Sequence, residues 1–272
     1  MKRQKIKINL VLASMLAHFG DEKLSTTSLA RRQEFNIGGK KVKIPVYSGN
    51  AFRGQCRRLI MDDFLELSGI DEISPKMYHT LFSGGALTSG LSFSMEDKKE
   101  LTSYIPPLSL LGTAIGDTIL TGKCSFGICY PICSELNGYN SKQSEVSYRN
   151  FISDTFHTRR DDTKSNLINL SNEDGAENPV QMKYEFEGLV PGTELETEVI
   201  IEGANDIELS CLGRILKLFK ENSFIGGKSS IGYGKFAYYA DTAIDDSAYV
   251  EFVKDNADGI KAYIKELSAK LK

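Results

Sequence analysis

The chain has 272 residues, 41% hydrophobic and 25% charged, which suits one large globular domain or a core domain with insertions. No apolar run approaches the roughly 20 residues of a membrane-spanning helix, and polar residues interrupt the amino-terminal segment, so we expect a cytoplasmic protein with no membrane partner. A formal net charge of −3 argues against a simple polyanion-binding protein.

The charge is unevenly distributed along the chain. Residues 1–60 carry 13 Lys+Arg against 3 Asp+Glu, a net of +10, whereas residues 61–272 carry 20 against 33, a net of −13. This asymmetry predicts one polyanion-binding face on an acidic body. It fits equally a self-associating protein whose positive face meets the negative face of the next copy.

The amino-terminal elements are predicted from periodicity. Residues 5–12 alternate apolar and polar side chains, as a half-buried strand does. Residues 17–31 are polar and rich in Ser and Thr, which indicates a loop. Residues 32–46 contain two short strands around Gly38-Gly39, which is a hairpin signal.

A helix is expected next, because Ser48 or Asn50 can cap a segment that runs to about Leu67. Residues 71–116 are mixed, and Pro106-Pro107 interrupts a helix that begins near Glu96. One long strand is predicted over residues 118–132.

Three cysteines cluster in that strand region: Cys124, Cys129 and Cys133. Zinc sites commonly place their cysteines in close pairs, which this spacing lacks. The residues are therefore interpreted as buried thiols, with zinc ligation as the weaker alternative.

The carboxy-terminal half begins with a polar arm over residues 136–178 that has too few apolar residues for a core of its own. Two alternating strands follow, then a helix, a short strand and a last helix, with these expected bounds: 180–187, 195–201, 205–219, 235–239 and 246–271. The longest elements read strand, helix, strand, strand, helix, strand. This order predicts an α+β protein with a ferredoxin-like (RRM-like) core.

A glycine-rich segment lies between the expected helix at 205–219 and the last expected strand. Its sequence is Phe224-Ile-Gly-Gly-Lys-Ser-Ser-Ile-Gly-Tyr-Gly-Lys235. Glycines let backbone N–H groups converge on an anion, and Lys228 adds positive charge. The segment is not a Walker loop, which runs from a strand into a helix. The alternative is a tight turn that brings two elements close together.

The helix entry at Ser48 also favours anions. The apolar stripe of this helix is predicted from Phe52, Cys56, Leu59, Ile60, Phe64 and Leu67. Arg53 and Arg57 are four residues apart, so they are predicted to share a face that this stripe leaves open. In the alternative interpretation these arginines are solvated and pair with Asp62 or Asp63.

These two segments resemble the RAMP superfamily of CRISPR-associated proteins. The glycine-rich loop is similar to that family's carboxy-terminal signature, and Ile44-Pro-Val-Tyr-Ser-Gly-Asn-Ala-Phe-Arg-Gly54 is similar to the helix entry of its backbone subunits. Three further stretches resemble the type IV and related branches: Ser28-Leu-Ala-Arg-Arg-Gln-Glu34, Leu81-Phe-Ser-Gly-Gly-Ala-Leu87 and Thr158-Arg-Arg-Asp-Asp162.

The resemblance implies a hand-shaped subunit that binds a guide RNA backbone without reading its sequence. The palm would comprise residues 1–70, 117–135 and 193–272, with an inserted helical region at 71–116 and a β-rich thumb at 136–192. Its partners would be guide RNA, a target DNA or RNA strand, further copies of itself in a helical filament, and other CRISPR effector subunits. No cofactor is implied.

The RNA-binding residues that the resemblance implies lie in four groups. They are Arg31 and Arg32; Ser48, Asn50, Arg53 and Arg57; His157, Arg159, Arg160 and Met182; and Gly226, Gly227, Lys228 and Ser229.

The main expectation is that the chain is not an enzyme on its own. Two alternatives remain within the family: cleavage of target RNA by Asp21, and processing of guide RNA by His18. The three histidines, His18, His79 and His157, are scattered along the sequence, so they predict neither a metal site nor an acid–base pair.

Overall fold

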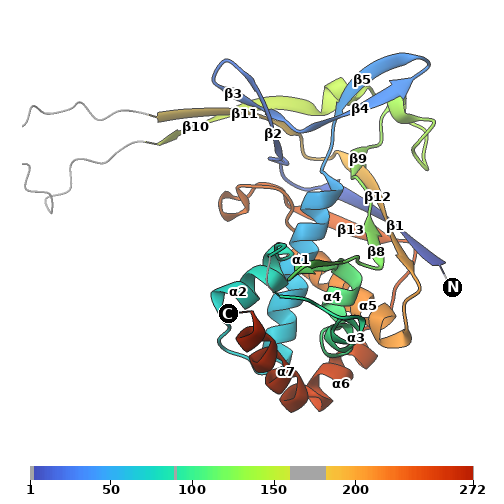
Figure 1. Ribbon diagram of the computed structural model, residues 1–272. Coiled ribbons are helices and arrows are strands. Elements are labelled where there is room, and N and C mark those ends of the chain that lie inside the picture. The colour runs from blue at the N-terminus through green and yellow to red at the C-terminus, as the bar shows by residue number, and fades with distance from the viewer. Residues whose placement is uncertain (1–2, 89–90, 160–181, 272) are drawn as a thin grey trace, which may run out of the picture.

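The computed structural model describes residues 3–88, 91–159 and 182–271. Its main sheet has the strand order β13-β1-β12-β8, with the short β9 also paired to β12, and all pairs are antiparallel (Figure 1). The strands are β1 (Arg3–Leu12), β8 (Cys124–Phe126), β9 (Tyr130–Pro131), β12 (Glu194–Glu202) and β13 (Phe236–Ala240). The fold is therefore α+β, as the sequence predicts.

The core lies between this sheet and two helices, α1 (Gly49–Leu67) and α5 (Asp206–Asn222). The apolar positions of β1 supply one side, and Ile6, Ile8 and Leu10 are fully buried. Phe52 of α1 and Phe219 of α5 meet in this core with ring centroids 4.7 Å apart. The alternation predicted for β1 and the apolar stripe predicted for α1 are thus confirmed.

A second sheet has the order β10-β11-β3-β2, from β2 (Phe19–Leu24), β3 (Thr27–Ala30), β10 (Ile152–Arg159) and β11 (Met182–Leu189). The prediction of a loop over residues 17–31 is wrong, because that segment forms the β2–β3 hairpin. Phe19 packs edge-on against Phe186 of β11, with centroids 5.2 Å apart. This tertiary contact compensates for a polar local sequence.

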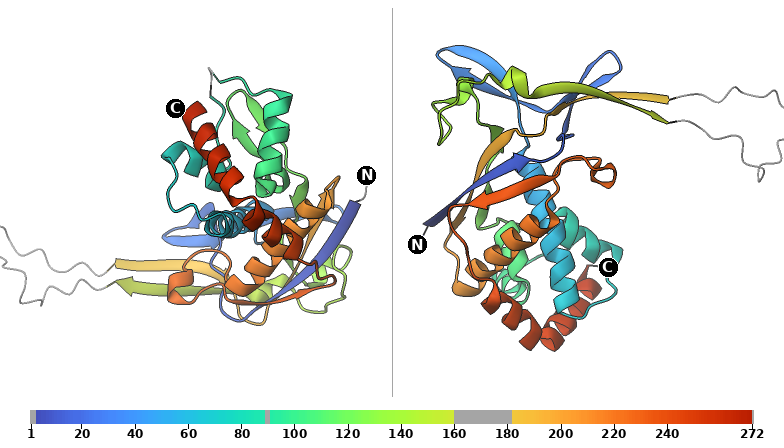
Figure 2. Two further views of the ribbon diagram at one scale, coloured as in Figure 1. Left: turned by 90° about the horizontal axis from the view of Figure 1, so that it is seen from below. Right: turned by 180° about the vertical axis from the view of Figure 1, so that it is seen from behind.

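The expected hairpin is confirmed as β4 (Arg32–Ile37) and β5 (Lys40–Pro45). The first part of the predicted polar arm does not extend away from the body, because residues 134–151 fold onto the β4–β5 hairpin. Leu136 is buried beside Ile44 and Cys133 in a second small core, and Tyr139 packs against Phe35 at 5.8 Å. The β10–β11 hairpin, in contrast, projects away from the body that contains the helices (Figure 2).

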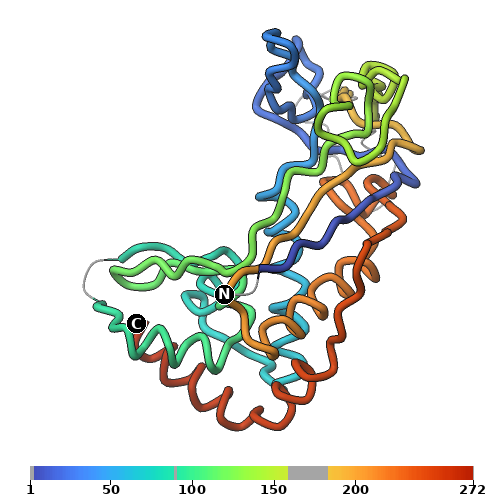
Figure 3. Tube along the Cα trace, turned by 90° about the vertical axis from the view of Figure 1, so that its right-hand side faces the viewer, coloured from blue at the N-terminus to red at the C-terminus, as the bar shows by residue number. Residues whose placement is uncertain are grey.

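The inserted region contains α2 (Pro75–Tyr78), a π-turn over His79–Ser83, α3 (Met95–Tyr104), α4 (Pro106–Leu111) and the hairpin β6 (Thr113–Ile115)–β7 (Thr118–Leu120). The two prolines end α3 and begin α4, where a missing N–H costs nothing. This region and the carboxy-terminal helices lie below the main sheet, whereas the β2–β5 segment lies above it (Figure 3).

Two predicted elements are broken in the structure. The single strand over 118–132 is three short strands, β7, β8 and β9. The last helix divides at Asn256 into α6 (Ser247–Asp255) and α7 (Ala257–Lys270). The interpretation of Cys124, Cys129 and Cys133 as buried free thiols is confirmed. In the described ranges, no helix has the length and apolar character needed to cross a membrane.

Candidate functional site

The amino terminus of α1 is fixed by two contacts. Ser48 is the N-cap, and its Oγ accepts from the Ala51 N–H at 3.3 Å. The Ser48 N–H donates to His18 Nε2, also at 3.3 Å. Burial, with the Arg31 charge as a second cause, lowers the pKa of His18 to about 4. The imidazole is therefore neutral near pH 7, as an acceptor must be.

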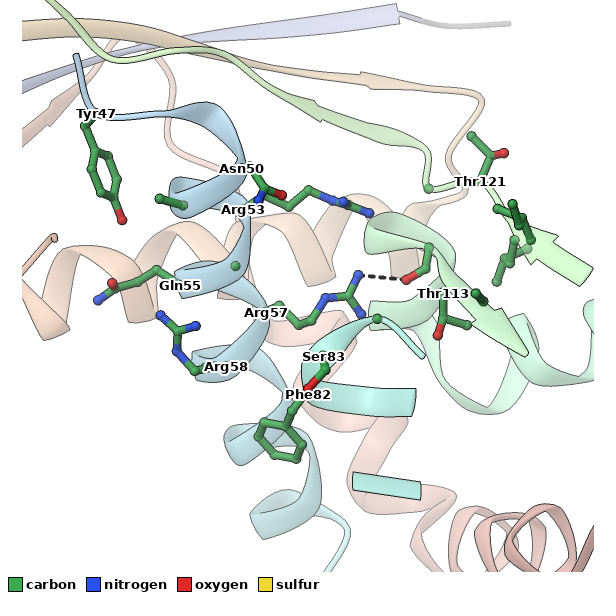
Figure 4. A pocket seen from close by; sticks show the side chains of 18 of the residues that line it. Tyr47, Asn50, Arg53, Gln55, Arg57, Arg58, Phe82, Ser83, Thr113 and Thr121 are labelled. Atoms are coloured by element: carbon green, nitrogen blue, oxygen red, sulfur yellow. Dashed lines mark hydrogen bonds between the residues drawn. The ribbon is translucent and has the colours of Figure 1, made fainter. Parts of the chain in front are cut away.

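A trough crosses the exposed face of α1. It consists of a 790 Å³ cavity, shown in Figure 4, and an adjoining 470 Å³ cavity. The two cavities share Gln55, Arg58 and Gly226. Three arginines line it, Arg53, Arg57 and Arg58, and no carboxylate appears among its described lining residues. In a chain with a net charge of −3, this local excess of positive charge favours an anionic occupant.

Arg57 lies at the base of the trough and is only 5% exposed. Its guanidinium donates to the carbonyl oxygens of Leu81 (3.1 Å), Leu111 (2.7 Å) and Gly112 (2.7 Å). Burial first, and the charge of Arg53 second, lower its pKa to about 10, so it stays protonated near pH 7. Arg53 and Arg57 share a side of α1 as predicted, but that side is not open at Arg57, because carbonyls of the inserted region cover it.

Arg53 is half-buried, and its Nη2 donates to the Leu111 carbonyl. The alternative interpretation, in which these arginines pair with Asp62 or Asp63, fails for Asp63, because Asp63 bonds to Arg214 of α5 at 3.1 Å through that arginine's Nε. The exposed Asn50 lines the larger cavity together with Arg53.

Arg58 is the residue that sequence reasoning missed. It is exposed and lines both cavities. In Figure 4, Arg53 and Arg57 extend to one side of α1, whereas Gln55 and Arg58 extend to the other. Arg58 directly follows Arg57 in the sequence, but the sequence does not show which of these two arginines the inserted region covers.

The glycine-rich loop forms the wall of the trough beyond Gln55 and Arg58. Gly226 has φ +76°, and a Cβ there would lie 2.6 Å from the Ala17 carbonyl oxygen. The Gly227 N–H donates to the same oxygen at 2.7 Å. The Gly227 N–H is therefore used within the chain, as the tight-turn interpretation implies, and RNA contact by the two glycines stays a prediction.

The rest of that loop faces outward. Lys228 adopts a left-handed conformation, φ 62°, and its Nζ lies 5.2 Å from the Phe186 ring centroid and 5.9 Å from that of Tyr184. Ser229 is exposed and lines the smaller cavity. Hydroxyl and ammonium groups thus lie between the trough and the β10–β11 hairpin.

His157 of β10 joins that hairpin to the loop. Its Nε2 lies 2.8 Å from the Tyr233 hydroxyl, and its ring stacks on Phe186 with centroids 5.5 Å apart. Arg159 and Met182 are paired residues at the far end of the hairpin, and their side chains lie outside what the structure describes. Arg160 lies outside the described residues altogether.

The remaining predicted residues lie near the β2–β4 segment. Arg31 is exposed, and its N–H donates to the His18 carbonyl at 2.7 Å. Arg32 forms a 2.5 Å ion pair with the buried Glu187, so its guanidinium has a partner within the chain, and RNA contact by Arg32 stays a prediction. Asp21 is exposed on β2, which is a strand and not the expected loop.

The trough offers guanidinium, amide and hydroxyl groups, which suit a chain of phosphates and sugars. Among the described residues, no group of three or more His, Cys, Asp or Glu side chains is placed to hold a metal ion.

Comparison with known proteins agrees with this geometry. The family model described as "RAMP superfamily" matches residues 46–237, which include α1, the inserted region and the whole glycine-rich loop. A solved structure titled "Type IV-B CRISPR Complex" contains a chain similar in fold, with a TM-score of 0.65 and 18% identity. The similarity covers 88% of this chain and 91% of that one. No curated protein sequence matches the chain.

Proposed function

Because the chain belongs to the RAMP superfamily, we propose that it binds the backbone of a guide RNA as a repeated subunit of a CRISPR effector complex of type IV or a close relative. The sheet order β13-β1-β12-β8 is the order of a ferredoxin-like palm, and the projecting β10–β11 hairpin fits a thumb (Figure 1).

The trough is the observation that carries the proposal. Three guanidinium groups line it, with no carboxylate among its described lining residues, so its field attracts phosphates and repels cationic groups. Its polar groups come from α1 and the glycine-rich loop, and contacts of this kind to phosphate and sugar carry no sequence information. One subunit can then bind any guide.

Neighbouring copies are proposed to meet through the thumb. Phe156 of β10 is 66% exposed and Tyr184 of β11 is 43% exposed, so the projecting hairpin presents apolar side chains to a neighbouring copy. The basic residues 1–60 and the acidic remainder provide opposite charges for successive copies along one RNA. Other effector subunits are proposed as partners, since the similar solved chain comes from a complex.

Binding without cleavage is proposed for the isolated subunit. Two features support this role. Asp21 lies alone on an exposed strand, where the neighbouring Glu22 is paired with Lys43 at 2.9 Å. His18 uses Nε2 to accept the Ser48 N–H, which occupies the nitrogen that would take a proton.

Affinity for a labelled single-stranded RNA, measured by fluorescence anisotropy over a salt series, tests the proposal. We expect tight binding at low salt, a steep linear fall of log K with log salt, and equal affinity for unrelated sequences. A flat salt dependence, or loss of binding when the sequence changes, would contradict a grip on the RNA backbone.

The same preparation with Mg²⁺ should leave the RNA intact. Cleavage that disappears in Asp21→Ala, or in His18→Ala, would replace the binding role with one of the two ribonuclease alternatives.

A further inference from the structure

The glycine at position 54 lies in the second turn of α1, inside a 19-residue helix. Glycine destabilises a helix interior relative to alanine, because it has more backbone freedom to lose on folding. An interior glycine therefore needs another explanation, which is usually close packing or the close approach of a ligand.

Two other helical glycines of the chain, Gly49 and Gly213, are explained by packing. A Cβ at Gly49 would lie 2.5 Å from the Phe126 carbonyl oxygen, and one at Gly213 of α5 would lie 2.7 Å from the Ile244 carbonyl oxygen. Both positions exclude any side chain because backbone atoms cannot move aside.

Gly54 has no such neighbour in the described part of the chain. The nearest atom to a Cβ there would be Nη1 of Arg58, 3.8 Å away at the end of a flexible side chain. Its backbone conformation is that of an ordinary helix, which alanine adopts readily. Nothing within the described chain requires a glycine.

Gly54 does line the trough. Arg53 extends from one side of the helix there and Arg58 from the other (Figure 4). A phosphodiester chain that contacts both arginines passes over the helix between them. A side chain at position 54 would hold that chain away from the helix and from both guanidinium groups.

We propose that Gly54 is the point where the RNA sugar–phosphate backbone lies in van der Waals contact with the backbone of α1, and that the missing side chain sets the depth at which Arg53 and Arg58 reach it. This inference rests on the proposed RNA-binding function. It assigns Gly54 a positioning role, since the two arginines make the polar contacts.

The test compares the thermal midpoint and the RNA affinity of Gly54→Ala in the full chain. We expect the midpoint to rise by about 2–4 °C, because alanine is the better helix former. We expect the Kd for labelled single-stranded RNA to rise about tenfold, because a methyl group intrudes on a close contact. Gly54→Leu should weaken binding further.

Gly259→Ala is the matched control. It adds the same methyl group to an exposed position of α7, 3.5 Å from a Tyr104 ring carbon and outside the trough, so its RNA affinity should equal that of the wild type. If the wild type binds RNA and both Gly54 variants bind it equally well, the inference is overturned and the RNA-binding function stands. If the wild type itself shows no salt-dependent RNA binding, both the inference about Gly54 and the proposed RNA-binding function are contradicted.

Discussion

The amino-terminal half of α1 and the glycine-rich loop face each other across one trough, but they use their residues differently. In the loop, Gly226 and Gly227 are held against the Ala17 carbonyl, so the motif glycines mainly hold the chain together. In α1, Gly54 and Arg58 face the trough, and no described chain contact requires a glycine at 54. The glycines of the glycine-rich loop thus serve mainly the fold, whereas α1 supplies the open surface for contact with a ligand.

Arg57→Ala should have the largest effect on stability. It tests whether α1 contains a structural arginine, Arg57, beside the open contact residues Gly54 and Arg58. Removing the guanidinium takes the Arg57 donor from three buried carbonyl groups, of which Leu111 keeps the donor from Arg53. We expect the free energy of unfolding to fall by about 3 kcal/mol, measured by urea denaturation. A loss below about 1 kcal/mol would mean that the inserted region does not depend on this residue.

Gly226→Ala should destabilise the protein by about 2 kcal/mol, because alanine tolerates the positive φ poorly and its Cβ would meet the Ala17 carbonyl. The same substitution at Gly54 should raise stability, so the two glycines give opposite signs in one denaturation assay. Equal signs would break the distinction between loop and helix.

Arg58→Ala should have the smallest effect on the fold and a clear one on binding. Because the side chain is exposed, stability should change by less than about 0.5 kcal/mol. The Kd for RNA should rise about tenfold, and the salt slope should fall by about 1.

Arg3→Ala serves as the matched control for Arg58→Ala. Arg3 is an exposed arginine paired with Glu202 at 2.9 Å and is absent from the trough lining, so its removal should leave RNA affinity unchanged. An equal loss in both variants would show that net charge, and not the trough, governs binding.

The elements that local sequence specifies were predicted well. The cap at Ser48, the alternation of β1 and the Gly38-Gly39 hairpin all depend on neighbouring residues. The β2–β3 hairpin was missed because its stability comes from a contact with Phe186, distant in sequence. The break at Asn256 was missed because the apolar stripe continues on both sides of it.

In the candidate site, too, the features that depend on local sequence were predictable and those that depend on distant residues were not. That anion-binding groups gather near Ser48 and the glycine-rich loop was predictable from residue types. Which arginine is covered was not, because Arg57 is buried by carbonyls of the inserted region that lie 54 and 55 residues away. Arg32 likewise depends on Glu187, 155 residues away.

Gln55 gives the trough one more property. Its Nε2 donates to the Asn222 side chain at 3.0 Å and to the Phe224 carbonyl at 2.8 Å, which ties α1 to the start of the glycine-rich loop. The two walls are thereby held at a fixed separation before any ligand arrives. Association then carries little cost for ordering this part of the protein, and diffusion and electrostatic steering set its rate. Conformational entropy is lost chiefly by the RNA.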